Sequence, residues 1–259
     1  MKLNYKGIDI HYTKEGVGKT VVLLHGFLEN LGMWNEVKKS FLKSNRVVTI
    51  DLLGHGKTSC LGYIHTMEEM ADAIEAVLKE LRIRKPILVG HSMGGYVALA
   101  YAEKYPEKVK GFCLMNSTTL EDDEERKKLR ARANKMVQTN FDAMVRMSFV
   151  NLFGEQSKSI YKKEIETALA EALQTPLQGY IACQEGMRIR PNRTHVLQKA
   201  NYPKLFIIGK NDPVVDYEAS LKEVKETNSE FVVFPNGHMS HIENTEELSK
   251  CLLKFLRSV

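Results

Sequence analysis

Short apolar runs alternate with helix-patterned stretches in both outer parts of the chain. Nearly continuous apolar runs of this kind indicate strands of a parallel sheet that is buried on both faces. The predicted strands are Thr20–Leu24, Arg46–Ile50, Pro86–Val89, Val109–Met115, Lys204–Ile208 and Phe231–Phe234. The predicted helices between and after them are Met33–Leu42, Met67–Leu81, Gly94–Tyr105, Tyr217–Glu226 and a last one from about Thr245. A short hairpin, Leu3–Tyr5 with Ile8–Tyr12, is expected before the first of these strands.

The strand pattern is interrupted in the middle of the chain. The mixed-charge run Glu121–Arg132 is typical of a solvated helix. Three further stretches also have helical patterns: Phe141–Leu152, Ser157–Leu173 and Leu177–Met187. We therefore expect residues 1–116 and 200–259 to form one α/β domain, and residues 117–199 to form a helical insertion.

Composition fits a single globular domain without nucleic-acid or membrane partners. The chain has 259 residues, and its formal charge of +5 is spread over 37 basic and 32 acidic side chains. No nucleic-acid-binding motif is recognisable, and no apolar run approaches the roughly 20 residues of a membrane span. The four cysteines (Cys60, Cys113, Cys183, Cys251) are far apart and have no metal-ligand spacing. These features predict a soluble, cytoplasmic protein.

Ser92 is the strongest candidate for chemistry. It stands at the centre of Gly90-His91-Ser92-Met93-Gly94, between a predicted strand and a predicted helix. A sharp strand-to-helix turn exposes the serine hydroxyl only if the residues two before and two after are small, and both are glycine. The pattern predicts a nucleophilic serine.

A serine hydroxyl needs a base to take its proton and a carboxylate to orient that base. Asp212 follows the predicted strand Lys204–Ile208, and His238 follows Phe231–Phe234. Because the carboxyl ends of parallel strands share one edge of the sheet, both side chains are expected to lie near Ser92. We predict a catalytic triad of Ser92, Asp212 and His238.

With these motifs, the sequence resembles the α/β-hydrolase family over nearly its whole length. The resemblance rests on His25-Gly26-Phe27, on Asp51-Leu52-Leu53-Gly54-His55-Gly56, on the serine turn, and on the loops of Asp212 and Gly237-His238. The order Ser, Asp, His along the chain is also that of the family. The resemblance implies an α/β-hydrolase fold: a mostly parallel central sheet flanked by helices, with the insertion 117–199 as a helical cap. It also implies an oxyanion hole formed by the backbone N–H groups of Phe27 and Met93.

The acid and the base of the triad each have a rival. His241 competes with His238, although the family histidine directly follows a glycine. Asp216 competes with Asp212, but its position favours a helix cap. Some relatives place the acid after the preceding strand, where this chain has Asn116. His25 and His91 are interpreted as hydrogen-bonded scaffold residues, with direct chemistry as the alternative; Asp51 and His55 are expected to shape a turn.

A serine nucleophile is typical of acyl chemistry and argues against the relatives that attack with aspartate. The leading hypothesis is a carboxylesterase acting on small to medium apolar esters. The alternatives are a thioesterase, a carbon–carbon hydrolase or menaquinone-pathway-like synthase acting on an anionic substrate, and a ligand-binding receptor. No cofactor and no metal site are implied, and the expected partner is a small-molecule ester or other acyl substrate.

The apolar substrate pocket is predicted from residues of the cap and of the loops around the triad. The candidates are Leu28, Trp34, Met144, Phe149, Phe153 and Met239. Three arginines near the end of the cap, Arg188, Arg190 and Arg193, are interpreted as solvated surface residues, with carboxylate binding as the alternative.

Overall fold

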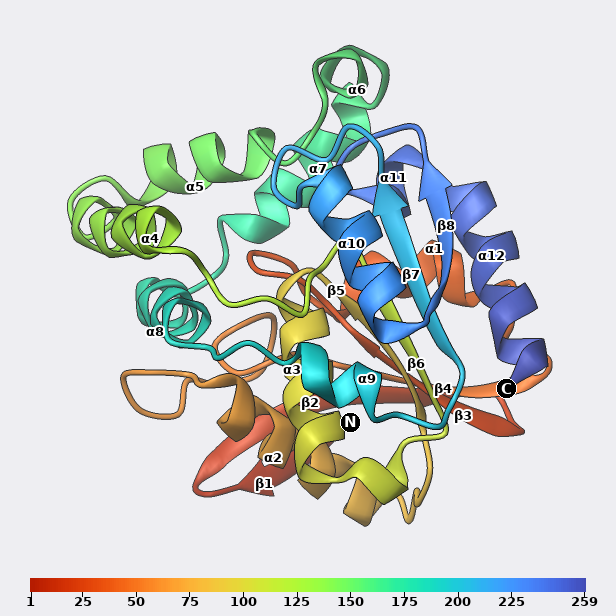
Figure 1. Cartoon of the computed structure of the whole chain (residues 1–259). Helices are drawn as coiled ribbons and strands as arrows, with labels where there is room; N and C mark the ends of the chain where they lie inside the picture. Colours follow the sequence, from red (N-terminus) through yellow and green to blue (C-terminus); the bar gives the residue numbers. More distant parts are fainter.

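A computed structural model describes all 259 residues and contains one eight-stranded sheet (Figure 1). Its strand order is β1-β2-β4-β3-β5-β6-β7-β8. The bounds are β1 Lys2–Tyr5, β2 Ile8–Glu15, β3 Lys19–Leu24, β4 Asn45–Ile50, β5 Ile87–His91, β6 Gly111–Met115, β7 Lys204–Gly209 and β8 Glu230–Phe234. β2 pairs antiparallel with β1 and β4, and all other pairs are parallel. The predicted hairpin and the six predicted strands are confirmed, with small shifts at their ends.

Both faces of the sheet are buried, which is why the strands are apolar at nearly every position. Successive side chains point to opposite faces, so Val22 and Leu24 join one core cluster and Val21 and Leu23 the other. Helices of the first face are α2 Met67–Glu80, α3 Met93–Lys104, α9 Thr194–Gln198 and α10 Tyr217–Thr227. The second face is covered by η1 Leu31–Trp34, α1 Asn35–Lys38 and α12 Thr245–Ser258. The short helices η2 Pro106–Lys108 and α11 Ser240–Glu243 lie in connections.

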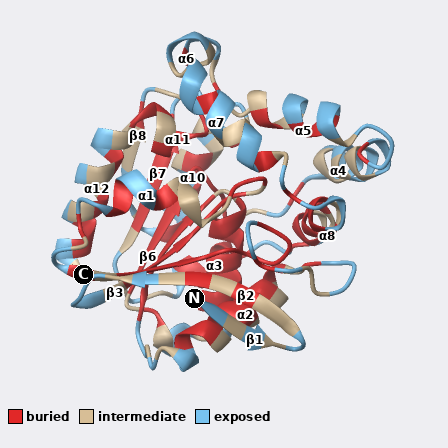
Figure 2. Cartoon of the chain, turned by 180° about the vertical axis from the view of Figure 1, so that it is seen from behind, coloured by how far each residue is buried: buried red, intermediate tan, exposed pale blue.

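The insertion after β6 forms a layer of helices over the sheet. Its helices are α4 Glu124–Met136, α5 Phe141–Val150, α6 Glu155–Ile160, α7 Lys162–Ala172 and α8 Leu177–Arg188. In Figure 1, α6 lies at the top of the view, above the arrowheads of β7 and β8. Figure 2 shows buried strands at the centre and largely exposed outer surfaces on α4, α5 and α6. No helix combines the length and apolar character needed to cross a lipid bilayer.

Three details of the predicted helices are wrong. The stretch 157–173 is not one helix, because the chain turns at Tyr161, whose hydroxyl donates to the Glu243 carbonyl at 2.9 Å. The helix expected at 33–42 is shorter and begins as the 3₁₀ turn η1. Helix α9 was not predicted; its Val196 and Leu197 belong to the core cluster of the first face. The chain therefore rejoins the core ahead of the boundary expected at residue 199.

Candidate active site

Ser92 occupies a strained turn between β5 and α3. Its φ of 48° and ψ of −116° lie outside the regions that L-residues ordinarily adopt. The neighbouring glycines permit this turn, since a Cβ at Gly90 would lie 2.4 Å from the Gly94 carbonyl oxygen. A Cβ at Gly94 would lie 2.4 Å from the Leu24 carbonyl oxygen. Both contacts are with backbone atoms, so the requirement for glycine predicted at these two positions is confirmed.

Asp212 and His238 form a buried pair at the ends of β7 and β8. His238 Nδ1 lies 2.8 Å from Asp212 Oδ2 and 3.0 Å from Oδ1. The backbone N–H groups of Val214 and Val215 also donate to Oδ1, at 2.8 and 3.0 Å. Burial by itself would raise the pKa of Asp212, but His238 and the N–H donors outweigh it and lower the pKa. Asp212 is therefore ionised and holds His238 with its proton on Nδ1, while His238 Nε2 makes no hydrogen bond within the protein.

The rivals of the triad residues have other partners. His241 lies 3.6 Å from Glu29 Oε1, and burial lowers its pKa to about 4. Asp216 caps α10 by accepting from the Ala219 N–H at 2.7 Å. Asn116, at the end of β6, donates to Asp212 Oδ2 at 3.1 Å. The geometry therefore favours Asp212 and His238 as the acid and base.

The loop after β3 presents the predicted oxyanion donors. The N–H of Phe27 makes no hydrogen bond within the protein. Met93 is the first residue of α3, and the first N–H groups of a helix have no partner inside it. On either side of Phe27, the Gly26 N–H donates to Glu29 Oε2 at 2.6 Å and the Leu28 N–H to His55 Nε2 at 3.2 Å. The loop is therefore fixed on both sides of a free donor.

Buried, neutral histidines fix the loop after β3 by hydrogen bonds. His25 Nδ1 donates to the Gly26 carbonyl at 2.7 Å, and its Nε2 accepts from the Leu52 N–H at 2.9 Å. Burial lowers the pKa of His25, and it lowers that of His55 to about 3. Asp51 accepts from the N–H groups of Leu31 and Lys57, at 2.8 and 2.9 Å. These are the hydrogen-bonding and turn-shaping roles expected from the sequence.

A cavity of about 170 Å³ lies between the core and the cap and contains both Ser92 and His238. Apolar side chains form much of its wall, and Arg130, Ser148 and Gln184 add polar groups on the cap side. Its full lining is Phe27, Leu28, Glu29, His91, Ser92, Tyr96, Arg130, Ser148, Leu152, Gln184, Met187, Val214 and His238. The cavity is small, so it favours a compact acyl or alcohol group next to Ser92.

Of the predicted pocket residues, only Leu28 lines this cavity. Trp34 is fully buried on the opposite face of the sheet, where it packs with Val37 and Phe41. The other four belong to the cluster that joins the cap to the core: Met144, Phe149, Phe153 and Met239. Phe149 and Met239 also line a second cavity of about 600 Å³ beside α7, whose lining shares Leu28 and Glu29 with the Ser92 cavity. The prediction for Trp34 and these four residues is wrong for the Ser92 cavity, because apolar patterning reports burial and not the cavity that a side chain faces.

Two of the three cap arginines are buried rather than solvated. Arg190 pairs with Asp122 at 2.7 Å, and its guanidinium lies 3.9 Å from the centre of the Tyr96 ring. Arg193 pairs with Glu68 and Glu103. Arg188 remains partly exposed and donates to Glu185 at 2.9 Å. None of the three lines the Ser92 cavity, so the alternative that they bind a substrate carboxylate there is also wrong.

Arg130 is the cavity arginine that the sequence did not reveal. It donates to Gln184 Oε1 at 2.7 Å and pairs with Asp122. Asp122 is shared with Arg190, so two guanidinium groups face one carboxylate and the cluster carries a net positive charge. Because α4 has no buried residue, the charge run contains no periodic signal that singles out Arg130.

The chain belongs to the α/β hydrolase fold family, whose model matches residues 19–245. It is an α/β-hydrolase enzyme. Among solved structures, a thermophilic esterase from Thermogutta terrifontis is 29% identical, with a TM-score of 0.93 over 99% of this chain and 96% of that one. An enol-lactonase from Burkholderia xenovorans LB400 shares the fold at 19% identity, with a TM-score of 0.92 over 99% of this chain and 100% of that one. A 2-hydroxy-6-oxononadienedioate/2-hydroxy-6-oxononatrienedioate hydrolase from Paraburkholderia phymatum is 28% identical over 96% of this chain and 91% of its own length.

Proposed function

We propose that this protein hydrolyses small to medium apolar carboxylic esters through an acyl-enzyme on Ser92. The observation that carries the proposal is the cavity containing both Ser92 and His238, with His238 held by the buried Asp212. The apolar wall formed by Tyr96, Leu152 and Val214 supports an apolar acyl or alcohol group. The similarity to the Thermogutta terrifontis esterase supports the same reaction class.

The first half of the reaction forms the acyl-enzyme. Nε2 of His238 accepts the hydroxyl proton of Ser92 while Oγ attacks the ester carbonyl carbon. The carbonyl oxygen becomes an oxyanion, which the N–H groups of Phe27 and Met93 stabilise. Collapse of the tetrahedral intermediate breaks the bond to the alcohol oxygen, which leaves with the proton from His238.

The second half releases the acid. A water molecule gives a proton to His238 Nε2 and attacks the acyl carbonyl. The intermediate collapses, the carboxylic acid leaves, and Ser92 Oγ recovers its proton from His238. Asp212 stays ionised in both halves and stabilises the imidazolium that forms.

Labelling with a fluorophosphonate tests the assignment of the nucleophile. We expect modification of one peptide, the one containing Ser92, and faster turnover of p-nitrophenyl acetate and butyrate than of long-chain esters. The reason for the chain-length preference is the small volume of the Ser92 cavity, about 170 Å³. Peptide mapping by mass spectrometry and a chain-length series provide the measurements. Modification at another residue would contradict the assignment.

A second candidate function is carbon–carbon bond hydrolysis or a related reaction on an anionic substrate. The observation that favours it is Arg130, which brings positive charge into the cavity. The Paraburkholderia phymatum relative is named as a hydrolase of dioate substrates, which carry two carboxylates.

Replacement of Arg130 distinguishes the two functions. If the substrate carries a carboxylate, Arg130→Met is expected to lower kcat/KM for an ester with a free carboxylate about 10- to 100-fold, the usual value of a charge-assisted hydrogen bond. Turnover of the neutral ester should change little. Arg132→Met, an exposed arginine of the same helix, is the matched control. Equal effects of Arg130→Met on both esters would contradict carboxylate recognition.

A further inference from the structure

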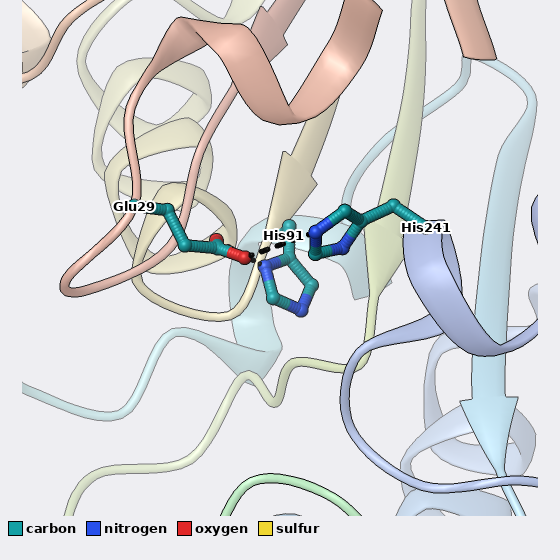
Figure 3. Close-up of side chains that lie close together, drawn as sticks. All are labelled: Glu29, His91 and His241. Atoms are coloured by element: carbon teal, nitrogen blue, oxygen red, sulfur yellow. Dashed lines mark hydrogen bonds and ion pairs between the residues drawn. The ribbon is translucent and has the colours of Figure 1, made fainter. Parts of the chain in front are cut away.

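Three buried residues, Glu29, His91 and His241, lie close together in the structure (Figure 3). Glu29 comes from the loop after β3, His91 is the last residue of β5, and His241 lies on α11. Glu29 and His91 also line the cavity itself. The reaction proposed above uses none of them. Burying ionisable groups costs free energy unless they are paired, so their bonds need an explanation.

The bonds of Glu29 and His91 connect the three segments that carry the proposed chemistry. Glu29 Oε2 accepts from the Gly26 N–H at 2.6 Å, directly before the oxyanion donor Phe27. The same oxygen lies 2.7 Å from His91 Nδ1, and His91 directly precedes Ser92. His91 Nε2 in turn lies 3.0 Å from the backbone carbonyl oxygen of His238. One chain of hydrogen bonds therefore runs from the oxyanion loop, past the nucleophile, to the catalytic histidine.

Both neighbours of the His91 ring are hydrogen-bond acceptors. A carboxylate oxygen faces Nδ1 and a carbonyl oxygen faces Nε2, so each nitrogen must donate and the ring is an imidazolium. Burial alone would lower the pKa of His91, but Glu29, with smaller help from Asp212, raises it. The pKa of Glu29 falls to about 2 despite its burial, because of His91 and, more weakly, His241 and His25. His241 stays neutral, with a pKa of about 4.

The same bonds argue against a metal ion at this cluster. A ring whose two nitrogens both donate hydrogen bonds has no lone pair to offer a cation. Glu29 Oε2 already accepts two N–H groups. The atoms without a hydrogen bond, Glu29 Oε1 and the two ring nitrogens of His241, come from two residues only, and two residues do not make a metal site.

We propose that Glu29 and His91 are positioning residues. They hold the Phe27 N–H and the His238 loop at the positions relative to Ser92 that the reaction requires. The proposal rests on the acyl-enzyme function of Ser92. Neither residue transfers a proton to the substrate. Their effect arises because misplacing an oxyanion donor or a base by about 1 Å costs up to about 100-fold in rate.

Two substitutions of Glu29 separate the effect of its hydrogen bonds from the effect of its negative charge. In Glu29→Gln, the amide oxygen takes the place of Oε2 and accepts from both the Gly26 N–H and His91 Nδ1, but the negative charge is lost. Glu29→Ala removes both bonds. We expect Glu29→Ala to lower kcat for p-nitrophenyl acetate roughly 30- to 100-fold, with KM within about twofold, and Glu29→Gln to stay within about threefold of wild type.

A matched control accounts for the loss of a buried glutamate as such. Glu75 of α2 is equally buried and bonds to Tyr101 of α3 and Lys108 of η2, and it does not line the Ser92 cavity. Glu75→Ala should lower the melting temperature without lowering kcat of the folded protein. If Glu29→Ala does not fold, His91→Gln replaces it, since one amide reaches either Glu29 or the His238 carbonyl but not both. His91→Gln is expected to lower kcat in the same way.

The outcomes distinguish this proposal from the proposed function. The rate of fluorophosphonate labelling should fall with kcat in Glu29→Ala, while the modified residue remains Ser92. Labelling of Ser92 at the wild-type rate in both Glu29→Ala and His91→Gln would overturn the positioning role and leave the hydrolase intact. Labelling of another residue in wild type would overturn the hydrolase assignment itself. Activity that a chelator removes and Zn²⁺ restores would overturn the positioning role in favour of a bound cation.

Discussion

Ser92→Ala is expected to lower kcat/KM for p-nitrophenyl acetate by about 10⁵- to 10⁶-fold, because no acyl-enzyme can form without Oγ. A small residual rate should remain, since the N–H groups of Phe27 and Met93 still polarise the ester carbonyl. The Ser92 side chain makes no hydrogen bond within the protein. Stability should therefore change by less than about 1 kcal/mol, measured by denaturant unfolding.

Ser148 is the other serine that lines the cavity, and it provides the comparison. Ser148→Ala should retain at least about a tenth of the activity, as expected for a wall residue without a base beside it. Steady-state kinetics of the two variants, with the uncatalysed rate subtracted, makes the measurement. Loss of activity in Ser148→Ala together with full activity in Ser92→Ala would reverse the assignment.

The fold was predictable because its signals are local. The strands are buried on both faces, so Val21 to Leu24 are apolar without interruption and are recognised without knowledge of their neighbours. The turn at Ser92 needs glycine on both sides, and this requirement produces a recognisable motif of five consecutive residues. Asp212 and His238 follow predicted strands, and the ends of parallel strands share one edge.

The arrangement inside the cavity was not predictable, because it depends on contacts between distant segments. Trp34 and Phe149 are both buried aromatic residues, and only the packing of η1 and of the cap determines that neither lines the Ser92 cavity. In the sequence, Arg130 does not differ from the other residues of its charged helix. Its contact with Gln184 of α8 distinguishes it only in the folded structure. Glu29 and His91 are 62 positions apart, so neither residue indicates the other in the sequence.

Asp212, the acid of the triad, has a polar neighbour with no role in the proposed reaction. Asn116 adopts a left-handed backbone with a φ of 46° at the end of β6, and its amide donates to Asp212 Oδ2 at 3.1 Å. Its own oxygen accepts from the Ser240 hydroxyl at 2.7 Å. A carboxylate at position 116 would therefore lie next to the oxygen that His238 contacts. The site therefore has two positions, 212 and 116, from which a carboxylate would lie close to His238.

Asp212→Asn is expected to lower kcat by about 10⁴-fold, because the amide cannot hold His238 with its proton on Nδ1 or stabilise the imidazolium. Adding Asn116→Asp should restore at least about tenfold of that loss, since a carboxylate then returns to the site from the neighbouring strand. Asn116→Asp alone should destabilise the protein, because two carboxylates would then share a buried site. Kinetics of the three variants tests this, and a double variant no faster than Asp212→Asn would mean that only the loop after β7 can orient His238.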